Sequence, residues 1–101
     1  MLEKEIQKAV LQYLELKRLC YWRNNTGAMV AEYKGKKRFV QFGKKGSADI
    51  FVVKNGNIFG LEIKTLSGKQ SEWQEVWQKE FQNAGGIYIL CRSIDDVMKI
   101  F

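Results

Sequence analysis

The segment 49–64 carries the pattern that most constrains the fold, an Asn-Gly pair between two runs of β-forming residues. Asn55-Gly56 is the strongest short-range signal for a two-residue β-hairpin, because both residues tolerate the positive φ of a type I′ turn. Counting outward from this loop places Asp49 directly opposite Glu62. Residues opposite each other in an antiparallel pair share a face, with Cβ atoms about 5 Å apart. The sequence therefore predicts two carboxylates side by side at the open end of the hairpin.

Two adjacent carboxylates repel each other unless a positive charge lies between them. Lys64 is two residues beyond Glu62, so strand alternation places its ammonium on the same face. This arrangement favours a metal site with a catalytic lysine. The alternative is a solvent-facing hairpin end with a surface ion pair that contributes little, and a three-residue loop through Asn57 would also shift the register. The residues alone leave both interpretations open.

The composition limits the possible chemistry. A chain of 101 residues with 46% hydrophobic content predicts one domain, 1–101, with one modest core. The chain has no histidine and only Cys20 and Cys91. These counts exclude a four-ligand structural zinc site and any His-dependent nucleophile. The two cysteines are expected to be buried thiols, although the sequence does not exclude a disulfide.

No apolar run approaches the roughly 18 residues of a membrane span, and the N-terminus lacks the apolar stretch of a signal peptide. We therefore expect a soluble, cytosolic protein without a membrane partner. No nucleotide cofactor is expected.

The positive charge is concentrated in the segment 21–48. Seven basic residues face one acid there, Glu32, while the remaining ten basic and ten acidic residues cancel, so the whole net charge of +6 lies in this segment. Such a surface suits DNA or RNA; a solvated lysine-rich turn or a localisation signal is the alternative. The predicted DNA-binding residues are Arg23, Lys34, Lys36, Lys37, Arg38, Lys44, Lys45 and, in the glycine-containing loop 43–48, Ser47.

The periodicity predicts an amphipathic helix over 3–19, with an apolar stripe of Ile6, Val10, Tyr13 and Leu14. Glu3 lies on the same face as this stripe. Its carboxylate either complements the helix dipole or is a third acid aimed at the site, and both interpretations remain open.

The remaining pattern predicts a mixed α/β sheet flanked by helices. Short β-type runs occupy 19–23, 28–33 and 38–42, ahead of the hairpin. A capping box from Ser71 to Gln74 opens a crossover helix, and the apolar run 87–91 is expected as a central, buried strand. The stripe predicted to be buried on the crossover helix is Trp73, Trp77, Phe81 and Ala84. A second capping box is expected at Ser93.

An ordered set of motifs resembles the PD-(D/E)xK nuclease superfamily, and specifically its virus-type replication-repair nuclease (VRR-NUC) branch. The likeness covers essentially the whole chain, with Ala48 departing from the proline usual before the aspartate. The motifs are Glu3-Lys4-Glu5-Ile6-Gln7, Asn25-Thr26-Gly27, Gly46-Ser47-Ala48-Asp49, Glu62-Ile63-Lys64, and Ser71-x-x-Gln74-x-x-Trp77 before a Gly-Gly helix end.

The resemblance implies a restriction-endonuclease-like fold with an αβββαβ core, and it assigns roles to individual residues. Asp49, Glu62 and the carbonyl of Ile63 would hold Mg²⁺ or Mn²⁺, with Glu3 completing the acidic pocket directly or through a water. Lys64 would orient or activate the attacking water. Gln74 would help to fix Lys64 or that water, alongside its capping role.

The resemblance also implies a substrate and an assembly. The chain resembles stand-alone phage and bacterial members of the family that act as homodimers on four-way (Holliday) DNA junctions. The resemblance implies a role in DNA repair, in the cytoplasm of a bacterium or of a phage-infected host. The helix from Glu3 and the strands around 29–42 are the candidate contacts between two copies. The alternatives are a nuclease acting on flaps or nicks within a larger complex, and a non-catalytic basic nucleic-acid-binding module.

Overall fold

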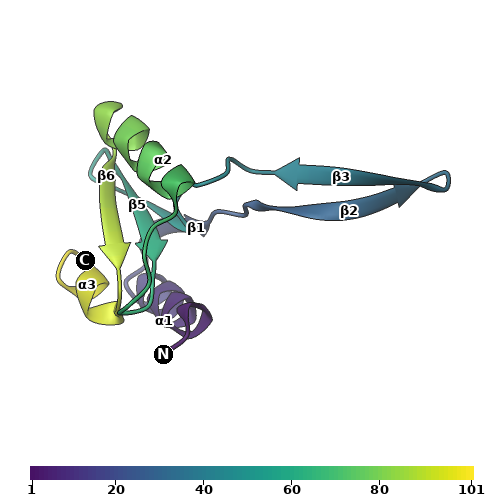
Figure 1. Cartoon of the computed structure of the whole chain (residues 1–101). Helices are drawn as coiled ribbons and strands as arrows, with labels where there is room; N and C mark the ends of the chain where they lie inside the picture. The colour runs from purple at the N-terminus through teal and green to yellow at the C-terminus, as the bar shows by residue number, and fades with distance from the viewer.

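The computed structural model describes all residues, Met1–Phe101, and consists of a mixed four-stranded sheet with helices on both faces and a separate two-stranded sheet (Figure 1). The four-stranded sheet has the order β1-β4-β5-β6. In chain order the elements are α1 (Glu3–Leu16), β1 (Cys20–Arg23), β2 (Gly27–Tyr33), β3 (Lys36–Phe42), β4 (Ile50–Lys54), β5 (Asn57–Ile63), α2 (Glu72–Asn83), β6 (Ile87–Cys91) and α3 (Ile94–Met98).

The β4–β5 hairpin has the predicted two-residue loop. Lys54 pairs with Asn57 and Ile50 with Leu61. Asn55-Gly56 takes positive φ values of 52° and 78°, as a type I′ turn requires. The predicted register is therefore confirmed up to the Ile50–Leu61 pair, which adjoins Asp49 and Glu62, and the three-residue loop is excluded.

One face of the sheet packs against α1 and α3 and holds the aliphatic core. This core contains Ile6, Val10 and Leu14 of α1, together with sheet residues and Val97 of α3. The predicted stripe of the first helix is thus confirmed. The helix ends at Leu16 rather than Leu19 because Arg18 adopts a left-handed φ of 54°, which turns the chain into β1.

The other face packs against α2 through aromatic side chains. Trp77 and Phe81 stack with ring centroids 4.5 Å apart, and both lie beside Phe51 of β4. The capping box is present, with Ser71 and Gln74 exchanging hydrogen bonds. The prediction that Trp73 and Ala84 are buried was wrong. Trp73 lies in the first turn and is 57% exposed, because the sheet contact of α2 is made further along, by Trp77 and Phe81.

The C-terminal part differs from expectation in two places. β6 pairs in parallel with β5 through the α2 crossover, as predicted, but it is an edge strand and not a central one. The reason is that β1 joins the opposite side, next to β4, so β4 and β5 form the centre. The capping box expected at Ser93 is absent, because the Asp96 carboxylate accepts instead from the backbone N–H of Arg92 at 2.8 Å.

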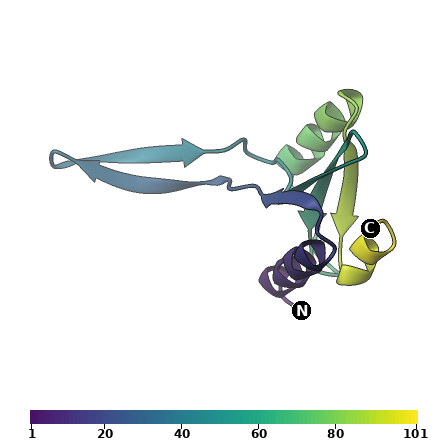
Figure 2. The ribbon, with the colours of Figure 1, turned by 180° about the vertical axis from the view of Figure 1, so that it is seen from behind.

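Strands β2 and β3 form a two-stranded ribbon that projects away from the rest of the molecule, as both views show (Figures 1 and 2). We call residues 27–42 the arm and the remainder the body. The molecule measures 50 × 30 × 29 Å, and its radius of gyration of 15.2 Å exceeds the roughly 13 Å expected of a compact chain of this length. The sequence predicted both strands but not their departure from the main sheet.

Both cysteines are free thiols. Cys91 is buried, and its burial raises the pKa of its thiol to about 12, whereas Cys20 is exposed, contrary to prediction. None of the helices is long and apolar enough to cross a membrane.

Two leucines of α1 test the assignment of the core. Leu14 is completely buried, whereas Leu16 is 82% exposed. We expect Leu14→Ala to lower the free energy of unfolding by about 2–5 kcal/mol, and Leu16→Ala to change it by less than about 0.5 kcal/mol. Urea unfolding of both variants measures the difference. Equal losses would contradict the packing described here.

Candidate active site

Asp49 is held at the start of β4 by three hydrogen bonds. Its backbone N–H donates to the Leu61 carbonyl at 3.0 Å, and its carbonyl accepts from the Asn24 N–H at 2.8 Å. Its side-chain Oδ2 accepts from the Ile63 N–H at 2.8 Å. The carboxylate is therefore fixed by the strand that also carries Glu62.

Glu62 is buried on the face of the sheet that α2 covers, with 1% of its surface exposed. Its Oε2 accepts from Nε2 of Gln74 at 3.2 Å. Its Oε1 is buried without any hydrogen-bond partner. Burying a carboxylate oxygen without a hydrogen-bond partner costs free energy. A proton or a cation bound to the Glu62 carboxylate would offset this cost.

The pKa of Glu62 reflects this environment. Burial raises it from 4.5 to about 9, helped by the nearby Asp49 carboxylate, while Lys64 acts in the opposite direction. Without a metal, Glu62 therefore keeps a proton at neutral pH. A hard cation between the two carboxylates would replace that proton and supply the missing partner of Oε1, so the residues present fit a Mg²⁺ or Mn²⁺ ion.

Lys64 follows β5 and remains available to the site. Its backbone N–H donates to the Cys91 carbonyl at 2.9 Å, which fixes its position in the sheet. The structure contains a single ion pair, Lys44–Glu80. The ammonium of Lys64 is therefore not neutralised by a carboxylate, although it is close enough to lower the pKa of Glu62.

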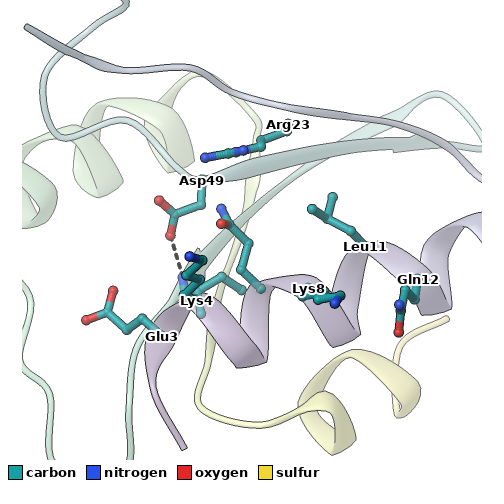
Figure 3. Close-up of a pocket in the computed structure, with 9 residues that line it drawn as sticks. Glu3, Lys4, Lys8, Leu11, Gln12, Arg23 and Asp49 are labelled. Carbon is teal, nitrogen blue, oxygen red and sulfur yellow. Dashed lines mark hydrogen bonds between the residues drawn. The ribbon is translucent and has the colours of Figure 1, made fainter. Parts of the chain in front are cut away.

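Glu3 lies apart from the carboxylate pair. It is exposed at the start of α1 and lines a groove of about 700 Å³ together with Asp49 and Ile63. Figure 3 shows Glu3 and Lys4 projecting from α1 on one side of this groove, with Asp49 and Arg23 on the other. No three acidic, Cys or His side chains are gathered closely enough to hold a metal ion. The structure thus brings together Asp49 and Glu62 as a pair and leaves Glu3 at the groove wall.

Gln74 fills its predicted capping role and also contacts the site, through Glu62 and not through Lys64. Its Oε1 accepts from the Ser71 N–H at 2.9 Å in the capping box, and its Nε2 donates to Glu62. The start of α2 is therefore tied directly to the carboxylate pair.

Two polar contacts near the site were missed by sequence reasoning. The Asn24 side chain donates to both Ser47 Oγ and the Ala48 carbonyl, each at 2.8 Å. Nε2 of Gln70 donates to the hydroxyl of Tyr88 at 2.9 Å. Burial raises the Tyr88 pKa, and the Glu62 charge adds to this effect. Only the position of Asn24 directly after β1 pointed to the first contact, and no local pattern indicates the second.

The predicted DNA-binding residues divide into two groups. The first group lies on the body: Arg23 lines the groove beside Asp49, Lys44 pairs with Glu80 of α2 at 3.2 Å, and the Lys45 ammonium lies 4.6 Å from the Trp73 ring. The second group lies at or near the tip of the arm and consists of Lys34, Lys36, Lys37 and Arg38.

Ser47 is placed differently from the other predicted DNA contacts. Its side chain is buried, and its hydroxyl donates to the Lys44 carbonyl at 2.6 Å while accepting from Asn24. This bonding assigns Ser47 to holding the loop before Asp49 rather than to contacting DNA.

Comparisons with protein-family models, curated proteins and solved structures found no match for this chain. The geometry of the site therefore carries the functional argument.

The raised pKa of Glu62 predicts how stability depends on pH. Between about 4.5 and about 9, folded Glu62 retains a proton that the unfolded chain has lost, so the metal-free protein should lose stability as the pH rises. Glu62→Gln should remove this contribution, which amounts to at most about 1.4 kcal/mol per pH unit. Urea unfolding in the presence of a chelator, at about pH 6 and about pH 8, measures the effect. Parallel profiles for the variant and the wild type would contradict the assignment.

Proposed function

We propose that this protein is a metal-dependent DNA endonuclease of the VRR-NUC type within the PD-(D/E)xK superfamily. The observation that carries the proposal is the Asp49–Glu62 pair, in which a buried oxygen lacks a partner and a lysine without an ion-pair partner follows on the same strand. The element order also supports it. Without the arm, the chain runs α1-β1-β4-β5-α2-β6, which is the order of the restriction-endonuclease-like αβββαβ core.

Asp49, Glu62 and the carbonyl of Ile63 are the proposed metal ligands, with Glu3 reaching the ion through a water. When bound, Mg²⁺ or Mn²⁺ neutralises charge on the phosphodiester and lowers the pKa of a water.

The side chains of the chain itself supply positioning and charge. Gln74 holds Glu62 in its orientation through a hydrogen bond. Lys64 presents a positive charge to the phosphoryl oxygens and orients the attacking water; such preorganised charge is effective because it is in place before charge develops. Arg23, which lines the groove beside Asp49, is the residue proposed to hold a flanking phosphate.

Lys64→Ala tests the catalytic assignment. We expect cleavage to require Mg²⁺ or Mn²⁺, and the variant to bind DNA while losing about 10²-fold or more in rate, typical of removing a group that stabilises the transition state. Lys69→Ala removes the same charge from an exposed position in the following loop and serves as the matched control. Single-turnover cleavage of labelled DNA measures both variants. Undiminished cleavage by Lys64→Ala would refute the assignment.

The proposed substrate is a branched DNA, with a four-way junction cut by a homodimer. The domain formed by residues 1–101 offers basic side chains for phosphate contacts, so the proposal assigns selectivity to DNA shape and phosphate contacts. Two symmetry-related active sites match the two scissile strands of a junction. Two copies also double the +6 charge, which strengthens phosphate binding steeply.

A comparison of substrates tests this part of the proposal. We expect paired, symmetric cuts in a four-way junction and slower cutting of flap, nicked and duplex DNA of the same sequence. Mapping of products on individually labelled strands, together with sedimentation of the complex, measures these properties. Equal cutting of flap and duplex would contradict the junction preference, and a monomer on the junction would contradict the dimer. DNA binding without cleavage in any metal would indicate the basic binding module.

A further inference from the structure

The arm exposes large apolar side chains on both of its faces. Met29 and Val40 pair on one face, at 55% and 39% exposure, and Val30 and Phe39 pair on the other, at 64% and 74%. A two-stranded ribbon is marginally stable by itself in water, and exposed apolar surface of this kind marks an interaction site. No part of the body covers the arm (Figures 1 and 2).

The turn of the arm determines which backbone groups face outward. Lys34 and Gly35 have φ values of 51° and 75°, as in a type I′ turn, whose flanking pair Tyr33–Lys36 is hydrogen-bonded. Hydrogen-bonded and non-hydrogen-bonded pairs then alternate along the ribbon. The outward groups of β2 therefore belong to Ala28, Val30 and Glu32, and those of β3 to Lys37, Phe39 and Gln41.

The two edges differ in charge. β3 carries Lys36, Lys37 and Arg38, whereas β2 has a single charged residue, Glu32. Lysines on an edge strand discourage pairing with another strand, and an uncharged edge does not. The β2 edge is therefore open and the β3 edge is protected.

The β2 sequence is suited to pairing with itself. Consider two β2 strands paired antiparallel about a two-fold axis at Val30, so that Ala28 of one copy lies opposite Glu32 of the other. The outward backbone groups of all three residues then form hydrogen bonds with the second copy, and no like charges lie opposite each other. The same arrangement of two β3 strands would place six basic side chains in adjacent strands.

We propose that the β2 edge is the dimerisation surface, joining two arms into a four-stranded sheet of order β3-β2-β2-β3. That the protein forms a dimer is part of the proposed function, whereas the choice of the β2 edge as its surface rests on the arm alone. DNA is the less suitable occupant of the β2 edge, because phosphates find no positive charge there. In the proposed four-stranded sheet, the two basic β3 strands form the outer edges.

Hydrogen exchange of the wild-type protein without DNA tests the proposal directly. We expect the amides of Ala28, Val30 and Glu32 to be protected and those of Lys37, Phe39 and Gln41 to exchange rapidly. Protection of the β3 amides instead, or rapid exchange of all six, would overturn the proposal. Protection of the β2 amides that appears only when DNA is added would assign the edge to DNA and would also overturn it.

A matched pair of proline variants provides a second test. Val30→Pro and Phe39→Pro each remove one outward N–H, at positions paired with each other in the ribbon, and proline is tolerated on the outer edge of a strand. We expect Val30→Pro to weaken dimerisation by about tenfold or more, since the symmetry removes the donor twice, and Phe39→Pro to leave it nearly unchanged.

Sedimentation velocity over a range of concentrations measures both variants, and thermal melts confirm that the body remains folded. Equal effects, or a monomeric wild-type protein, would refute the proposed surface. Cleavage is assayed separately, because a dimer without nuclease activity would overturn the proposed function alone, and an active monomer would overturn the interface and the proposed dimer while the nuclease assignment stands.

Discussion

Asp49 and Glu62 lie next to each other at the open end of the β4–β5 hairpin, and the rest of the site is arranged around these two carboxylates. Two ionised carboxylates so placed would repel each other, and Glu62 is buried as well, so without a cation the folded body holds Glu62 in its protonated form. The surrounding bonds hold the two side chains in place: the Ile63 N–H on Asp49, the Gln74 amide on Glu62, and the ladder of the two central strands. Strained or unsatisfied groups persist where many surrounding contacts hold them in place, and such groups concentrate at functional sites.

The two faces of the four-stranded sheet differ in their packing and in what they contain. The aliphatic face against α1 and α3 supplies most of the fully buried core. The aromatic face against α2 is less densely buried and contains Glu62. Gly60 marks a close approach there, since a Cβ at this position would lie 3.0 Å from Phe81 and 3.2 Å from Ala48. A larger residue would push α2 outward and with it Gln74, which connects the packing of this helix to the geometry of the site.

Local patterns predicted the parts of the structure that local physics determines. The Asn-Gly turn set the hairpin register, and with it the carboxylate pair, while the Ser71–Gln74 spacing located the start of α2. The errors arose where tertiary packing decides. Trp73 follows the helical period of Trp77 but lies beyond the edge of the sheet contact, and the apolar run of β6 was expected to be central although β1 occupies the other side. Similarly, charge counting found the basic segment, but only the three-dimensional structure separates the arm tip from the residues near Asp49.

The base of the arm has a further consequence. The chain leaves the body after Asn24 and returns at Ser47, and the Asn24 backbone and side chain bind Asp49, Ser47 and Ala48. The two ends of this excursion are therefore fastened to each other inside the body, and the entropy of closing such a loop varies only slowly with its length. The arm is thus a modular insertion. Related chains can lengthen it, shorten it or replace it without displacing Asp49, so the reach of the protein can change while its chemistry stays the same.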